Sequence, residues 1–163
     1  MNRLIYNYKF HVETVVDPRT IKGILDVGFR EYRQRNFQLA GLEFPDIRRI
    51  KDAEERRLAK ERWDAARPAL ELLLLYPDDL PEQPHGRTIV LATNAPNVHG
   101  RCLANAYVSC VRESATDSHL TVRRAGYVFI NVTHYMQHLA QHRFDLDVGK
   151  EILENCEPQD FDK

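Results

Sequence analysis

Residues 4–42 read LIYNYKFHVETVVDPRTIKGILDVGFREYRQRNFQLAGL, and this stretch decides the fold. It contains three segments rich in β-branched and aromatic side chains, at 4–17, 20–29 and 32–42, a composition typical of strands. An Asp-Pro pair lies between the first two segments. It marks a turn, because proline fixes its own φ and keeps its predecessor out of helical conformation. The stretch therefore predicts three consecutive strands.

A long helix is predicted directly after these strands. Between 47 and 75 the apolar residues recur near helical spacing with charged residues between them, most clearly over 54–75. Pro68 is expected to kink or split this helix, because a proline removes one backbone hydrogen bond. The charged residues predict a solvated face with Glu–Arg pairs one turn apart, and a protein-binding face is the alternative.

The second half of the chain supplies further strands and two shorter helices. A proline-rich surface loop is predicted at 77–87, and strands are predicted at 88–93, 102–111 and, as a further candidate, 120–132. A helix is predicted at 131–144. An acidic tail follows from Asp145, with a short helix near 148–153.

This order predicts an α+β, mainly β fold: a five-stranded OB-fold barrel with a long helix after strand 3 and C-terminal helices. We expect a barrel domain over residues 1–145 and an acidic C-terminal tail over 146–163.

Composition excludes several classes of protein. The chain has 163 residues, 43% hydrophobic and 29% charged, with a formal net charge of −1, so a polyanion must bind through a local patch and not through bulk charge. The longest apolar run is far too short to span a membrane, and the start of the chain lacks the pattern of a signal peptide. Three cysteines without close spacing argue against a disulfide scaffold or a cysteine zinc site. We expect a cytoplasmic protein with reduced thiols.

Four segments, in this order, resemble landmarks of the staphylococcal nuclease (thermonuclease-like) family: VVDPRTIKGILDVGF, FQLAGLEFPD, Gly100-Arg101-Cys102-Leu103-Ala104 and Asn131-Val132-Thr133-His134-Tyr135-Met136. The resemblance covers about residues 5–145. It implies calcium-dependent hydrolysis of DNA and RNA phosphodiesters. In that family two aspartates hold the metal, a glutamate assists the attacking water and two arginines bind the phosphate, which suits a hard cation and an anionic transition state.

Matched position by position, the resemblance implies an impaired site. Arg101 is kept, whereas Gln38 stands at the second arginine position and Arg19 at one metal-ligand position. Glu43 stands where the family has an aspartate, and Asp46 stands where it has a glutamate, so both positions keep a carboxylate but not its side-chain length. The resemblance therefore leaves a remnant catalytic site of Arg101, Asp46 and Glu43.

Calcium binding would require Asp17 to turn inward beside Glu43, because the Arg19 cation repels a divalent ion. We expect no cofactor, and calcium only if the chain is an active endonuclease. Arg19 could instead pair with Glu43 or Asp46. The alternatives for the remnant residues are structural: an ion-paired Arg101 and an Asp46 that caps a helix.

A basic cluster predicts nucleic-acid binding. Arg33 and Arg35 alternate on one strand and so share a face, and Tyr32 and Phe37 beside them could stack on bases. The alternative is a charged strand edge that prevents aggregation. The nucleic-acid-binding residues predicted in this way are Arg19, Arg30, Arg33 and Arg35, with Arg123 and Arg124 as weaker additions.

Histidines recur one turn apart in the helix predicted at 131–144. Two of His134, His138 and His142 could share a zinc ion, and the alternative is a surface stripe. Taken together, the sequence predicts a nuclease-like, catalytically impaired module. It would bind nucleic acid through the basic cluster or a protein partner through the 47–75 helix, and not a membrane.

Overall fold

The computed structural model describes residues 6–76, 86–93, 102–111, 119–124 and 126–161. Five strands close into a mixed barrel: β1 (Tyr6–Asp17), β2 (Thr20–Gly28), β3 (Glu31–Leu39), β4 (Thr88–Thr93) and β5 (Leu103–Cys110). Neighbouring strands in the order β3-β2-β1-β4-β5 are antiparallel, and a short parallel pairing of β3 with β5 closes the ring. This confirms the predicted α+β fold with a five-stranded OB-like barrel.

Alternation along β1 fills the barrel with apolar side chains. Phe10, Val12 and Val15 are fully buried, and two register shifts against β2 let the strand bend, as barrel closure requires. Gly23 of β2 is opposite Val12 of β1. A Cβ at this position would lie 2.1 Å from the carbonyl oxygen of His11, so the barrel requires a glycine here.

The long helix predicted after the third strand is α1 (Ala53–Leu74), and a short 3-10 helix, η1 (Ile47–Arg49), precedes it. The Asp52 carboxylate accepts a hydrogen bond from the Glu55 amide at 3.2 Å and caps the helix. The expected split at Pro68 is wrong, because α1 runs through it as one helix. Neighbouring residues, Ala69 and Leu70 among them, are fully buried in the core, and this burial outweighs the lost backbone hydrogen bond.

The strand predicted at 120–132 is two strands. β6 (Thr121–Arg124) and β7 (Tyr127–Asn131) form an antiparallel hairpin that turns at Gly126, whose φ is +82°. Glycine adopts such a φ without steric cost. β7 also pairs with β5 outside the barrel ring, and the two-residue β8 (Pro158–Gln159) pairs with the end of β5.

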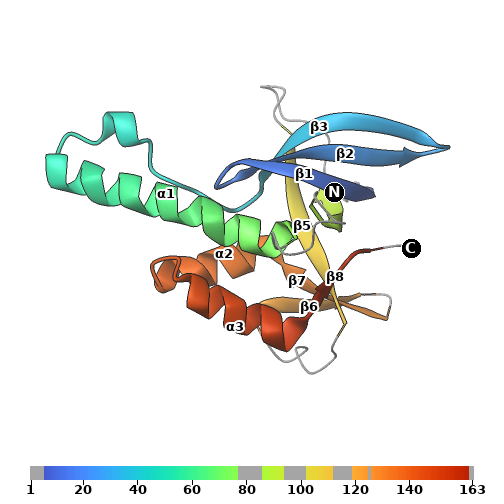
Figure 1. Ribbon diagram of the computed structural model, residues 1–163. Coiled ribbons are helices and arrows are strands. Elements are labelled where there is room, and N and C mark those ends of the chain that lie inside the picture. The colour runs from blue at the N-terminus through green and yellow to red at the C-terminus, as the bar shows by residue number, and fades with distance from the viewer. Residues whose placement is uncertain (1–5, 77–85, 94–101, 112–118, 125, 162–163) are drawn as a thin grey trace, which may run out of the picture.

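Two further helices, α2 (Val132–Gln141) and α3 (Leu146–Cys156), lie beneath α1 in Figure 1. Tyr135 of α2 is fully buried, and its hydroxyl donates a hydrogen bond to the Ala69 carbonyl oxygen of α1 at 2.9 Å. Gly149 of α3 lies against Tyr135, because a Cβ there would come within 3.0 Å of the tyrosine oxygen. The three helices therefore pack as one layer.

Two elements extend away from the barrel in opposite directions (Figure 1). The N-terminal half of α1 projects on one side, and the turn of the β2–β3 hairpin projects on the other. The acidic segment after Asp145 contains α3, where the short helix was expected, and continues to Phe161, whose amide donates to the Thr88 carbonyl oxygen at 3.0 Å. Among the described residues, no helix combines the length and the apolar character needed to cross a membrane.

Candidate nucleic-acid interface

The turn between β1 and β2 contains two of the residues singled out by the nuclease resemblance. The Arg19 amide donates a hydrogen bond to the Asp17 carboxylate at 2.9 Å, so this carboxylate stabilises the turn in which it lies. The Arg19 Nε is buried and has no hydrogen-bond partner within the described part of the chain. No ion pair joins Arg19 to Glu43 or Asp46 among the described residues.

The loop after β3 contains the other two carboxylates of the remnant site. Asp46 caps η1 by accepting from the Arg48 amide at 3.1 Å, and its carboxylate lies 3.5 Å from the Arg49 Nε. Glu43 is exposed. The described residues contain no group of three or more His, Cys, Asp or Glu arranged to hold a metal ion, so Asp17, Glu43 and Asp46 do not form one. Arg101 lies outside the described residues.

The β2–β3 hairpin exposes the predicted basic cluster. Arg33 pairs with Leu25, and Arg35 pairs with Gly23, so both arginines leave the sheet on one face, as the alternation predicts. Both are exposed because the hairpin extends past the closed part of the barrel (Figure 1). Arg33 lies 4.0 Å from the Glu31 carboxylate, a distance at which an exposed ion pair contributes little.

Aromatic side chains accompany these arginines, although not all the predicted ones. Tyr32 is 64% exposed, but Phe37 is only 3% exposed and packs edge-on against Phe10 inside the barrel, with ring centroids 5.4 Å apart. Phe37 therefore cannot stack on a base. Phe29 is the candidate for stacking in its place. It is fully exposed at the turn, where Phe29 and Arg30 both adopt positive φ, 56° and 61°.

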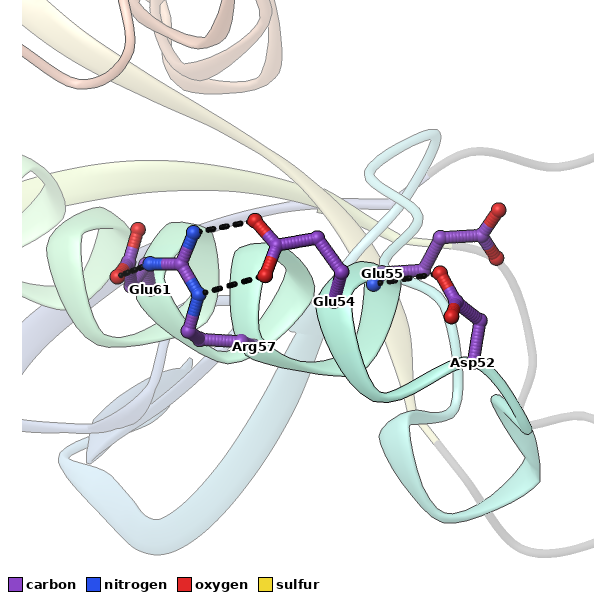
Figure 2. A network of polar contacts seen from close by, with 5 residues as sticks. All are labelled: Asp52, Glu54, Glu55, Arg57 and Glu61. Atoms are coloured by element: carbon purple, nitrogen blue, oxygen red, sulfur yellow. Dashed lines mark hydrogen bonds and ion pairs between the residues drawn. The ribbon is translucent and has the colours of Figure 1, made fainter.

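The N-terminal half of α1 is exposed to solvent and has ion pairs between side chains one turn apart. Figure 2 shows Arg57 between Glu54 and Glu61, with the Asp52 cap one turn earlier. The Arg57 hydrogen bond lowers the pKa of Glu54, and the same contact with Glu54, followed by the charge of Glu61, raises the pKa of Arg57. These are the i,i+3 and i,i+4 pairs that the charge pattern predicts.

An apolar groove of about 530 Å³ runs between α1 and the loop after β3. Phe44 from the loop packs edge-on against Trp63 of α1 at 5.2 Å, and Leu58 of α1 is 48% exposed at the groove. Glu43 and Arg62 also line it. The predicted catalytic remnant Glu43 therefore lies beside an apolar groove, which sequence reasoning missed.

The histidine cluster differs from the predicted stripe. The rings of His138 and His142 are 4.9 Å apart, and His119, which precedes β6, lies 5.3 Å from His138. Partial burial, followed by the charges of His142 and His119, lowers the pKa of His138. His134 takes part in none of these ring contacts. No signal near 131–144 could have identified His119, because it comes from another part of the chain.

A second groove, about 450 Å³ in volume, lies on the outer face of the barrel. It is lined by aromatic residues from β1, β5, β7 and the C-terminal segment, together with Lys9 and Arg124. Sequence reasoning named Arg124 as a weaker candidate but missed the aromatic residues. We call this site the aromatic groove.

The geometry thus brings the arginine cluster together with two exposed aromatic rings, and it does not gather the carboxylates of the nuclease-like site. The family resemblance remains a prediction from the sequence motifs. A comparison of the chain with protein-family models, with curated proteins and with solved structures found no match.

Proposed function

We propose that this chain is a module that binds single-stranded nucleic acid through its β2–β3 hairpin. The observation that carries the proposal is the full exposure of Phe29 at the hairpin turn, beside the exposed Arg30, Arg33 and Arg35. A fully exposed aromatic ring among cations matches the platforms on which bases stack while phosphates meet arginines. The OB-like barrel that presents the hairpin supports the same function by analogy.

The charges of the hairpin also support this proposal. The segment from Thr20 to Leu39 has four cations, Lys22, Arg30, Arg33 and Arg35, against two carboxylates, Asp26 and Glu31. Asp26 is occupied in part, because it accepts a hydrogen bond from the Gly28 amide at 2.9 Å. An excess of cations on a projecting element gives a local attraction to phosphates even though the chain as a whole has a net charge of −1.

Binding to a short fluorescent single-stranded oligonucleotide, measured by anisotropy over a salt series, tests this function. Three arginine–phosphate contacts on a single strand predict a slope of log K against log salt of about −2. The double reversal R33E/R35E should abolish most of the affinity, and Phe29→Ala should weaken it through lost stacking, worth about 1–3 kcal/mol per base.

The matched control is the double reversal K51E/K60E. It changes the net charge by the same amount, but at exposed positions just before and within α1, so it should leave the affinity close to wild type. The proposal is refuted if the wild type shows no binding at low salt, or if R33E/R35E binds as the wild type does.

A protein partner on α1 is the second candidate. The apolar groove beside the helix favours it, because Leu58 is half exposed there and Trp63 and Phe44 form its wall. Leu58→Asp, which adds a charge at an already exposed position, should abolish such an interaction without unfolding the chain. A partner captured equally by wild type and Leu58→Asp would exclude this surface.

A further inference from the structure

Five aromatic residues line the aromatic groove: Tyr8 of β1 and four others from three separate parts of the chain. Tyr107 comes from β5, Tyr127 and Phe129 come from β7, and Phe161 comes from the C-terminal segment. Ring centroids are 6.2 Å apart for Tyr107 and Phe129, 5.4 Å for Tyr127 and Phe161, and 5.9 Å for Phe129 and Phe161. These are the separations of packed aromatic pairs, so the rings form one continuous wall.

The fold holds this wall in place without any ligand. Phe129 is opposite Ser109 in the β5–β7 ladder and is only 6% exposed, so it forms the floor. Phe161 is fixed by its own amide, which donates to the Thr88 carbonyl oxygen at 3.0 Å, and by the preceding Asp160, which accepts from the Thr88 amide at 2.9 Å and from the Tyr76 hydroxyl. A site built in this way binds without the entropic cost of ordering a loop.

The chemistry of the lining selects a ligand that is both planar and anionic. Tyr127 is 36% exposed and presents ring surface to the groove. Lys9 and Arg124 supply positive charge, and the lining contains no carboxylate among the described residues. The volume of about 450 Å³ lies in the range of small-molecule sites. Aromatic rings with nearby cations suit a nucleobase and its phosphate.

A row of cross-strand neighbours connects the groove with the hairpin. Tyr32 pairs with Asp26, Asp26 with Lys9, Lys9 with Val90, and Val90 with Tyr107. Residues opposite one another project from the same face of a sheet, so all five lie on the outer face of the barrel, opposite the face from which Arg33 and Arg35 project. Four strand intervals of about 4.8 Å place the two ends of the row about 19 Å apart along the curved sheet.

We infer that the aromatic groove is a second contact site for the same single strand, which takes one unpaired nucleobase with its phosphate. This inference rests on the function proposed above. In it, the strand passes from Arg33 and Arg35 around the hairpin to Tyr32 on the outer face, and then crosses β3, β2, β1, β4 and β5 to the groove. Tyr127 and Phe161 stack on the base, Phe129 forms the floor, and Arg124 with Lys9 contacts the phosphate.

The test is the affinity of groove variants for the same fluorescent oligonucleotide. Tyr127→Ala and Phe161→Ala should each weaken binding roughly 10-fold, as the loss of one stacked base predicts, and Tyr127→Phe should retain the wild-type affinity because it keeps the ring. Phe44→Ala is the matched control, since it removes an aromatic ring packed against Trp63, in the apolar groove along α1, and it should bind as wild type does.

Photo-cross-linking of the wild type to an oligonucleotide that contains 5-iodouracil makes the test independent of how the variants fold. Adducts are expected on peptides that contain Tyr127 or Phe161 as well as on the hairpin. Wild-type affinity in both alanine variants, or adducts confined to the hairpin, would overturn the groove while leaving the proposed function intact. If R33E/R35E alone retained full affinity while the groove variants lost it, the hairpin would fail and the groove would stand.

Adenosine monophosphate distinguishes a strand from a free nucleotide as the source of the base. We expect it to compete only weakly with the oligonucleotide, because it cannot occupy the groove and the hairpin together. A mononucleotide that bound the groove as tightly as the oligonucleotide would overturn the assignment to a strand. No binding of either probe to the wild type at low salt would refute both the groove and the proposed function.

Discussion

Replacement of Tyr135 by phenylalanine should destabilise the chain at neutral pH and stabilise it in strong alkali. Tyr135 lies where α2 meets α1 and α3, is fully buried, and donates its hydroxyl to the Ala69 carbonyl oxygen at 2.9 Å. Tyr135→Phe removes one oxygen and leaves the ring in place. The lost hydrogen bond is worth about 1 kcal/mol at pH 7, where the phenol is neutral in both the folded and the unfolded chain.

Alkaline pH reverses the sign of this difference. Burial raises the pKa of Tyr135 in the folded chain, whereas an unfolded tyrosine titrates near pH 10. The contribution of Tyr135 to the stability of the wild type is therefore fully present below about pH 10. Above that pH this contribution falls by about 1.4 kcal/mol per pH unit, up to the pKa of Tyr135 in the folded chain. The phenylalanine variant has no such group. The free energies of unfolding of variant and wild type should therefore become equal between about pH 10 and 11, and the variant should be the more stable above that pH.

Urea unfolding followed by the fluorescence of the single tryptophan, Trp63, measures both stabilities. We expect the variant to be less stable at pH 7 and equal or more stable near pH 11. Tyr32→Phe is the control, since Tyr32 is 64% exposed, and it should follow the wild type at every pH. A difference between Tyr135→Phe and wild type that stays constant from pH 7 to 11 would refute the reasoning.

The remaining predictions concern the barrel, the thiols and calcium. Gly23→Ala should lower the free energy of unfolding, measured in urea, by about 3 kcal/mol or more, because its Cβ would lie 2.1 Å from a β1 carbonyl oxygen. Gly126→Ala is the control: open space surrounds that position, and the variant should lose only about 1 kcal/mol. Equal losses in the two variants would contradict the close approach at Gly23. Cys110 and Cys156 are both buried, and the interaction between their thiols raises the pKa of Cys110 and lowers that of Cys156. Diamide should therefore oxidise the two thiols to a disulfide and stabilise the chain by about 4 kcal/mol. Mass spectrometry that finds both thiols still reduced would contradict this. Millimolar calcium should neither raise the melting temperature nor cause cleavage of single-stranded DNA, and chelator-sensitive cleavage would revive the endonuclease alternative.

The barrel could be predicted from the sequence because its signals are local. Phe10, Val12 and Val15 give the inward face of one strand, and the Asp-Pro pair marks the turn to the next. The parallel contact of β3 with β5 that closes the ring has no local signal. The turn inside 120–132 had one, Gly126, but a single glycine in a strand pattern also fits a bulge.

Alternation predicted correctly that Arg33 and Arg35 share a face, and it misled us about Phe37. All three residues alternate on one strand, so a period of two places them on the same side. What separates them is depth: Phe37 lies where the barrel is closed, whereas the arginines lie on the hairpin beyond it. Closure depends on distant strands, and the sequence of β3 alone contains no information about it.

The aromatic groove was not predictable for a similar reason. Its aromatic residues are at positions 8, 107, 127, 129 and 161, and only Tyr127 and Phe129 are close enough in sequence to form a visible pattern. Phe161 reaches the groove because the C-terminal segment pairs with β5 and bonds to Thr88. Such a site can be found only after the long-range pairings are known.

A net charge of −1 is compatible with binding a polyanion because the charges are segregated by element. The β2–β3 hairpin has an excess of cations, whereas α3 has three carboxylates, Asp147, Glu151 and Glu154, against the single cation Lys150. The two elements lie well apart, on different sides of the barrel in Figure 1. Because screening limits such fields to about 10 Å at 0.1 M salt, a phosphate chain near the hairpin is attracted there and is not repelled by α3. Segregation therefore favours phosphate binding at the hairpin, and in the proposed complex the row from Tyr32 to Tyr107 leads from there along the outer face to the aromatic groove.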